Sequence, residues 1–230
     1  MLANSAVTHM GTDTPVSVYT TQCISPACTT CIVNYFFRER LMIYIIRHGQ
    51  TKLNHSNALQ GRSDLPLNEN GKQQAASAGE WLAAKGIRFD RIYSSPLQRA
   101  VQTAELVAPG VPVTIDERLI EMDYGPYEGV DLKSPPPEIL TFFSDFEHNP
   151  APDGMEQLSS VLARSASFLE DIKNVNGNIL ISTHAIAMKG LLEVLTPESH
   201  GSYWSKYIGN CSVYAAERCD GWFGIPKELC

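Results

Sequence analysis

Short apolar runs alternate with longer amphipathic stretches along most of the chain, and this alternation predicts its secondary structure. Runs dense in apolar residues predict strands at residues 42–47, 91–94, 111–115, 178–183 and 211–217. Apolar or small residues at helical spacing predict helices at residues 68–87, 96–107, 155–172 and 185–195. Gly86 is placed to end the first helix, and Pro96 begins the second after Ser95 as its cap.

Strands that alternate with helices of this length predict an α/β fold, a three-layer α/β/α sandwich around a largely parallel sheet. In such sheets ligands bind beyond the carboxyl ends of the strands, where helix N-termini present free backbone N–H groups. Arg47 and His48 end the first predicted strand, and His184 ends the fourth. Arg99 lies one turn into the helix after the second strand. The sequence therefore predicts that these side chains meet at one edge of the sheet.

Residues 1–41 differ from the rest because they are rich in Thr, Ser and Cys and show no sustained helical or alternating period. We predict that they form a poorly ordered N-terminal extension. A start codon placed too far upstream would explain the same segment, because Met42 opens the first clear strand. Residues 42–230 are then predicted to form one domain, which suits a chain of 230 residues of which 43% are hydrophobic.

Charge and hydropathy limit the partners of the chain. A formal net charge of -7 argues against nucleic acid, since phosphate backbones are bound through surplus Lys and Arg. The longest apolar stretch, residues 32–46, is interrupted by Arg38, Glu39 and Arg40, so no membrane span is predicted. Residues 1–10 lack Lys and Arg and do not resemble a secretory signal. A cytoplasmic location is therefore predicted.

The cysteines offer one alternative to a metal-free protein. In a cytosolic chain the six cysteines are expected to be reduced thiols. The spacing Cys23-x4-Cys28-x2-Cys31 suggests a metal knuckle or a redox element, but no fourth ligand stands at a typical spacing. We predict no metal, and comparison of the metal content of the full chain with that of a chain starting at Met42 would separate the two cases.

Five ordered segments carry the candidate chemistry: residues 47–54, which begin Arg47-His48-Gly49 and end at Asn54; Gln60-Gly61; residues 94–104 with Arg99; residues 119–129 with Glu121 and Glu128; and Ser182-Thr183-His184. Together they resemble the histidine phosphatase superfamily, the phosphoglycerate-mutase-like proteins, over about residues 42–194. The resemblance implies a phosphoglycerate-mutase-like fold and phosphoryl transfer through a phosphohistidine. Ala185 departs from the glycine that many members have after the second histidine, and its methyl group would narrow the pocket.

The residue types suit a phosphate monoester, whose transfer spreads charge over three oxygens that need fixed donors. Arg47 and Arg99 supply planar forks that match this geometry, and Asn54 supplies an amide donor. His184, if protonated, would add a third positive charge. Gln60 and Gly61 are included as phosphate-binding candidates, with an ordinary loop as the alternative.

A neutral imidazole can attack phosphorus through one ring nitrogen while the other donates its proton to a fixed acceptor. The resemblance assigns this role to His48, and Gly49 is expected to let the backbone turn closely around the phosphate. Glu121 matches the position of the acid that protonates the leaving group, with Glu128 as the competing candidate. No metal or organic cofactor is expected, because arginine and histidine supply the positive charge.

We predict a hydrolase of a small phosphorylated metabolite, with water as the acceptor. The region after residue 42 lacks the long insertions by which phosphoglycerate mutases enclose a bisphosphate, although a mutase remains an alternative. A non-catalytic module that binds phosphorylated protein is the second alternative. Residues 135–155 and 197–210, which contain Phe142, Phe143, Phe146 and Trp204, are predicted to choose the substrate or to form a homodimer contact.

Overall fold

The computed structural model describes residues 41–146, 148–219 and 221–230. The predicted N-terminal extension lies outside these residues except for Leu41. Cys23, Cys28 and Cys31 lie outside them too, so the poorly ordered extension and the metal knuckle stay predictions from the sequence.

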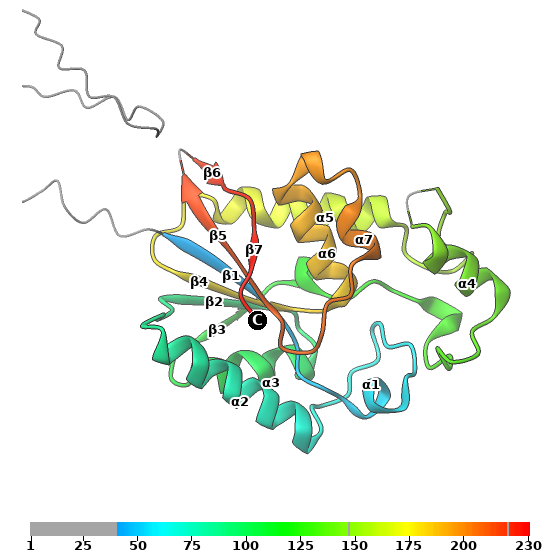
Figure 1. Ribbon diagram of the computed structural model, residues 1–230, viewed down its shortest axis with the longest axis horizontal. Helices are drawn as coiled ribbons and strands as arrows, with labels where there is room; N and C mark the ends of the chain where they lie inside the picture. Colours follow the sequence, from blue (N-terminus) through cyan, green and yellow to red (C-terminus); the bar gives the residue numbers. More distant parts are fainter. Residues whose placement is uncertain (1–40, 147, 220) are drawn as a thin grey trace, which may run out of the picture. The chain divides into compact units, whose positions relative to one another are not determined.

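A seven-stranded sheet forms the middle layer, with the order β3-β2-β4-β1-β5-β6 and with β7 paired to β5 (Figure 1). Its strands are β1 (Met42–Arg47), β2 (Arg91–Ser94), β3 (Val113–Ile115), β4 (Ile179–Thr183), β5 (Val213–Cys219), β6 (Trp222–Phe223) and β7 (Lys227–Glu228). Strands β1 to β4 are mutually parallel, and β5 joins β1 in the antiparallel direction. The prediction of a largely parallel sheet is confirmed, with an antiparallel edge added by β5, β6 and β7.

Helices cover both faces of this sheet (Figure 1). The helices are α1 (Lys52–Ser56), α2 (Glu69–Ala84), α3 (Gln98–Val107), α4 (Pro137–Ser144), α5 (Leu158–Ile172), α6 (Ala185–Leu195) and α7 (Ser202–Ser205), with short 3-10 turns at Glu117–Leu119, Gly125–Tyr127 and Pro197–Ser199. Successive side chains of a strand point to opposite faces. Ile43 and Ile45 of β1 therefore pack with α5 and α6, whereas Tyr44 and Ile46 pack with α2 and α3. The predicted three layers are confirmed.

Helix α3 begins two residues later than predicted, and the reason lies outside the local sequence. Ser95 lies before the helix, whose N-cap residue is Leu97. The Oγ of Ser95 accepts from the backbone N–H of Leu97 at 3.3 Å and contacts a ring nitrogen of His184 at 2.7 Å. Asp64, from a distant loop, instead accepts a hydrogen bond from the backbone N–H of Gln98 at 2.7 Å. Asp64 thus fixes its loop against the start of α3.

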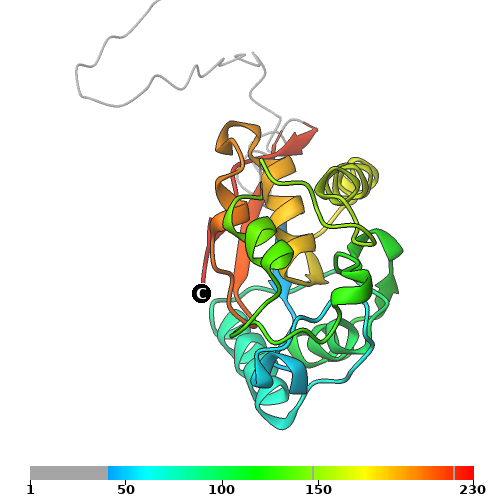
Figure 2. The ribbon, with the colours of Figure 1, turned by 90° about the vertical axis from the view of Figure 1, so that its right-hand side faces the viewer.

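Strands β1, β2 and β4 end at one edge of the sheet. Figure 2 shows the molecule from the side on which α1 and α4 lie. The residues that follow these strands are His48, Ser95 and His184. Backbone bonds hold this edge in register, since His48 N–H donates to Thr183 O at 2.9 Å and Ser95 N–H donates to Ser182 O at 3.0 Å. No helix of the described residues is long and apolar enough to span a membrane.

Candidate active site

A pocket of about 440 Å³ opens at the carboxyl end of β1. Its polar lining includes five predicted site residues: Arg47, His48, Asn54, Gln60 and Glu121. Its lining also includes aromatic and apolar residues from the segments that were predicted to choose the substrate: Phe143, Phe146, Trp204, Tyr207 and Ile208. The structure thus brings five of the eight predicted site residues into the lining of one pocket.

Two further site residues, Arg99 and His184, are fully buried and stand behind this lining in contact with each other. Gly61 is buried as well and presents its carbonyl to Arg99 at 2.6 Å, not to the pocket. A Cβ at position 61 would lie 2.6 Å from the backbone carbonyl oxygen of Met122, so this loop requires glycine.

The hydrogen bonds of His48 define its tautomer. Its Nδ1 lies 2.7 Å from the carbonyl oxygen of Gly49, and a carbonyl can only accept, so Nδ1 carries the proton. Nε2 therefore carries the lone pair, and it accepts a hydrogen bond from Nε of Arg99 at 3.2 Å. Burial, together with the positive charges of Arg99 and Arg47, lowers the pKa of His48 well below 6.5. The ring is thus neutral and has the tautomer that a nucleophile needs.

The second histidine shares the same arginine. Nε of Arg99 also donates to Nδ1 of His184 at 3.1 Å, so one N–H lies between two acceptor nitrogens. With Nδ1 accepting, Nε2 of His184 carries the proton and donates to Ser95 Oγ at 2.7 Å. Burial and Arg99 lower the pKa of His184 well below 6.5. The third positive charge that a protonated His184 would bring is therefore absent from this arrangement.

Arg99 was predicted to bind phosphate with its guanidinium group. Both terminal nitrogens of that group instead donate hydrogen bonds to a loop of the protein. Nη1 donates to Ser63 O at 2.7 Å and Nη2 to Gly61 O at 2.6 Å. Glu128 fixes that loop from the other side, accepting from the backbone N–H of Arg62 at 2.5 Å and from the Ser63 hydroxyl at 2.7 Å. Glu128 thus acts on Arg99 through the loop.

Arg47 keeps an unused donor. Its Nη1 donates to the carbonyl of Ile208 at 2.5 Å, while its buried Nε has no hydrogen-bond partner among the described residues. Burial lowers the pKa of Arg47 from its usual value, and the negative charge of Glu121 opposes this shift. A buried donor without a partner is costly, and an anionic oxygen in the pocket would remove that cost.

Glu121 is buried at the amino end of α6. Its Oε1 accepts from the backbone N–H groups of Met122 at 2.9 Å and Ala187 at 3.0 Å, and its Oε2 accepts from Ile186 at 3.2 Å. These three backbone N–H groups fix the orientation of the carboxyl group. Oε2 has the fewer partners, so it is the oxygen with room to exchange a proton with a ligand.

Asn54 and Gln60 use their carbonyl oxygens to shape the wall. Asn54 Oδ1 accepts from the backbone N–H of Thr51 at 3.2 Å, while Thr51 Oγ1 accepts from Asn54 N–H and caps α1. Gln60 Oε1 accepts from the Thr51 hydroxyl at 2.6 Å. The amide NH₂ group of Asn54 is the end left for a ligand, whereas Nε2 of Gln60 already donates to the carbonyl of Ser63 at 3.5 Å and keeps one N–H for a ligand.

Thr103 is a site residue that the sequence reasoning missed. Its hydroxyl accepts from Gly49 N–H at 3.0 Å and donates to Arg99 O at 2.7 Å, so it links the loop after β1 to α3. The spacing of four residues between Arg99 and Thr103 was the available signal.

Packing gives a further reason for glycine at position 49. A Cβ on Gly49 would lie 2.4 Å from the carbonyl oxygen of Gly71, in the first turn of α2.

Asn210 and Lys189 were missed as well. The side-chain amide of Asn210 donates to the carbonyl of His48 at 2.9 Å and supports the backbone of the histidine loop. Lys189 lines the pocket from the second turn of α6. Asn210 stands 162 positions from His48, so no local pattern connects the two.

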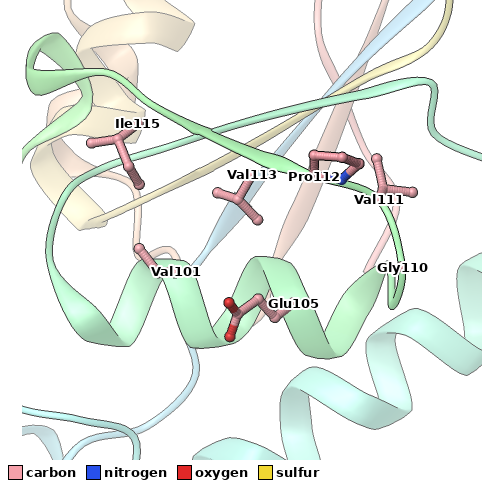
Figure 3. A pocket seen from close by; sticks show the side chains of 7 residues that line it. All are labelled: Val101, Glu105, Gly110, Val111, Pro112, Val113 and Ile115. Carbon is pink, nitrogen blue, oxygen red and sulfur yellow. The ribbon is translucent and has the colours of Figure 1, made fainter.

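A second hollow, between α3 and β3, has a different character (Figure 3). Its volume is about 540 Å³, and its described lining is Val101, Glu105, Gly110, Val111, Pro112, Val113 and Ile115. The one charged group there is a carboxylate, which repels phosphate. The candidate site is therefore located by its chemistry and not by the size of the hollow. Within the described residues, no group of three or more His, Cys, Asp or Glu side chains is arranged to hold a metal ion.

The fold and the paired buried histidines define an α/β protein with a site for phosphoryl groups. Residues 43–225 match the family model of the histidine phosphatase superfamily (branch 1). The chain belongs to this superfamily, and the predicted class of phosphohydrolase is confirmed.

Relatives carry both phosphatase and mutase names. The chain is 33% identical over 179 residues to a putative phosphoserine phosphatase 2 of Hydrogenobacter thermophilus, covering 74% of this chain and 86% of the relative. It is 34% identical over 182 residues to a probable phosphoglycerate mutase GpmB of Salmonella arizonae, covering 75% and 83%. A crystal structure of a phosphoserine phosphatase mutant from Entamoeba histolytica in complex with phosphoserine superimposes with a TM-score of 0.69 at 26% identity, covering 83% of this chain and 95% of that one.

Proposed function

We propose that this protein hydrolyses phosphate monoesters of small metabolites through a phosphohistidine on His48, with water as the acceptor and without a metal. The observation that carries the proposal is the state of His48: Nδ1–H is fixed on the Gly49 carbonyl at 2.7 Å, and the neutral Nε2 is held by Arg99 at 3.2 Å beside a pocket. This is the tautomer and environment that nucleophilic attack on phosphorus requires.

In the first step, Nε2 of His48 attacks phosphorus and its lone pair forms the P–N bond. The P–O bond to the alcohol breaks, its electron pair moves to the leaving oxygen, and Glu121 gives that oxygen a proton from Oε2. The Nε group of Arg47, which lacks a partner among the described residues, receives a phosphoryl oxygen. Asn54 and Gln60 offer amide N–H groups from the same pocket lining.

In the second step, water attacks phosphorus and gives a proton to Glu121. The P–N bond breaks, its electron pair returns to Nε2 of His48, and inorganic phosphate leaves. The first-turn N–H groups of α6 hold Glu121 in place through both steps, because they bind the carboxylate whether or not Oε2 carries the transferred proton.

A mutase is the second candidate, and the 34% identity to a probable phosphoglycerate mutase favours it. The same phosphohistidine would then pass its phosphoryl group to a second alcohol. If 2,3-bisphosphoglycerate stably phosphorylates His48, and 3-phosphoglycerate isomerises faster than phosphate is released, the mutase replaces the hydrolase.

A metabolite phosphatase screen, run beside His48→Ala, tests the proposal. Wild-type protein is expected to release phosphate from some members of the panel and from p-nitrophenyl phosphate, and the variant is expected to release none. Acid-labile labelling of His48 during turnover would identify the intermediate. Absence of turnover on the whole panel, or equal activity of His48→Ala, would refute the proposal.

The cytoplasmic location and the homodimer remain proposals from the sequence. Exposed apolar residues of the described chain, such as Leu140 at 60% exposure, give a homodimer a plausible contact. Sedimentation of the purified chain would measure its oligomeric state.

A further inference from the structure

Lys189 is a pocket residue that the proposed steps do not use. It lies in the second turn of α6 and lines the same pocket as Arg47, His48 and Glu121. Its Nζ donates to the carbonyl oxygen of Trp204 at 2.6 Å and stands 5.4 Å from the centre of the Phe146 ring. An ammonium group has three N–H donors, so this contact leaves two of them for a ligand.

The pocket holds a second lysine in a different electrostatic state. Lys206 forms an ion pair with Glu228 at 2.8 Å and is thereby neutralised. Lys189 has no such carboxylate partner among the described residues, and a neutral carbonyl is the acceptor that it contacts. Lys189 is therefore a half-buried cation that forms no ion pair among the described residues, although the charge of Glu121 acts on it.

The cations of the site differ in what they can still bind. Arg99 stands behind the pocket wall, where its terminal nitrogens hold the carbonyls of Gly61 and Ser63 and where Glu128 and Asp64 act on its charge. Arg47 lies beside His48, where the phosphoryl group is proposed to bind. Lys189 lines the same pocket and is therefore the cation available to an anion on the alcohol part of the substrate.

The position of Lys189 on α6 indicates where an anion on the alcohol part of the substrate would bind. Ala185, Ile186 and Lys189 line the pocket, and their spacing of three to four residues places them on one face of the helix. The first turn of that face binds Glu121, so Lys189 stands one turn farther along, about 5.4 Å along the axis. A carboxylate two or three bonds from the ester oxygen reaches this distance from phosphorus.

We propose that Lys189 selects phosphate monoesters whose alcohol part carries a carboxylate close to the ester oxygen. This inference rests on the proposed function, because it assumes that the phosphoryl group lies against Arg47 and His48. Burial lowers the pKa of Lys189 to about 8, with Glu121 opposing the shift and Arg47 adding to it. Lys189 is therefore still mainly charged at neutral pH, and a bound carboxylate would hold it so.

A pair of matched substrates tests the inference. 3-Phosphoglycerate and glycerol 3-phosphate have the same three-carbon frame and differ by a carboxylate in place of a hydroxymethyl group. Lys189→Met keeps most of the apolar stem and removes the charge. It is expected to raise KM for 3-phosphoglycerate about tenfold or more, and to change KM for glycerol 3-phosphate less than twofold. Lys189→Arg is expected to restore most of the preference, and Lys206→Met, the matched control, is expected to leave the ratio of the two KM values unchanged.

Binding to a His48→Ala background, measured by calorimetry with the same two compounds, separates this inference from the proposed function. Lys189-dependent binding of 3-phosphoglycerate without any turnover by wild-type protein would support the anion site and refute the hydrolase. Turnover of a metabolite panel with equal effects of Lys189→Met on both compounds, or with no effect, would keep the hydrolase and refute the anion site. If Lys189→Met weakened the binding of both compounds equally, the role of Lys189 would be structural, through its hydrogen bond to the carbonyl of Trp204.

Discussion

The two ends of the pocket are built in different ways. At the phosphate end, His48 and His184 follow the adjacent parallel strands β1 and β4, and Arg99 lies in the first turn of α3. All three side chains are buried, and Arg99 donates a hydrogen bond to each histidine. At the leaving-group end, aromatic side chains from α4 and α7 form the wall, and Tyr207 is 84% exposed. A hydrogen-bonded, buried end fixes the reaction, whereas an end made of packed rings can change its substrate without disturbing the chemistry.

Among the substitutions that test this comparison, Glu121→Gln is expected to have the largest effect on kcat. Removing the proton donor should lower kcat for an alkyl phosphate about 10²–10⁴-fold. With p-nitrophenyl phosphate the first step needs no proton, so the phosphohistidine should accumulate and release p-nitrophenol in a burst. Stopped-flow measurement of that burst checks the assignment.

Glu128→Gln is the matched control for that experiment, because Glu128 holds the 61–63 loop and is not in the described pocket wall. It is expected to slow both substrates by similar factors without a burst. A burst with Glu128→Gln, and none with Glu121→Gln, would reverse the two roles.

A smaller loss is expected from Arg99→Lys. Lysine cannot hold Gly61 O and Ser63 O while also donating between two histidines, because it lacks the planar fork. We expect kcat to fall about 10²–10³-fold for every substrate, with the leaving-group preference unchanged. A change in the ratio of kcat/KM for bulky and small substrates would contradict the separation of the two ends.

The two buried histidines of the phosphate end should also make the free energy of unfolding depend on pH. The pKa values of His48 and His184 are lowered well below 6.5 in the folded protein, so below pH 6.5 the unfolded chain binds protons that the folded chain does not. The free energy of unfolding should therefore fall as pH drops from 6.5, by about 1.4 kcal/mol per pH unit for each histidine. Urea unfolding between pH 7.5 and pH 5 measures this slope.

Substitution separates the two histidines from the other acid-sensitive groups. His184→Gln keeps a side chain that can bond Ser95 and should reduce the slope, whereas His55→Gln should not change it, because His55 is exposed. Equal slopes in the wild type and in His184→Gln would contradict a neutral, buried His184.

The same contrast explains how much could be predicted from the sequence. Strands β1 and β2 and helix α6 have the predicted bounds. β1 and α6 bury most of their residues, so apolar residues dominate both segments, and Pro197 follows the end of α6. The start of α3 was wrong because its cap, Asp64, comes from another part of the chain. Helices α1, α4 and α7 were not predicted, since short helices show too little of the helical period.

The site residues divide in a similar way. His48, Arg99 and His184 follow strand ends or stand near them, so topology alone brings them together. Lys189 and Asn210 do not follow a strand end. Their contacts with Trp204 and His48 depend on where the 197–210 segment lies, which no local pattern in the sequence indicates. Packing between distant segments thus decides the part of the pocket that the sequence does not reveal.

The smallest effect is expected at the apolar wall. Phe143 lines the pocket and contacts Phe146 and Tyr124 through tilted or edge-on rings, so Phe143→Leu keeps an apolar surface and removes the ring contacts. Aromatic contacts contribute about 0.5–1.5 kcal/mol, so KM for p-nitrophenyl phosphate should rise roughly two- to tenfold. KM for glycerol 3-phosphate, which is too small to reach that ring, should stay within twofold. If both values rise together, the aromatic wall supports the phosphate end, and the two ends of the pocket are not independent.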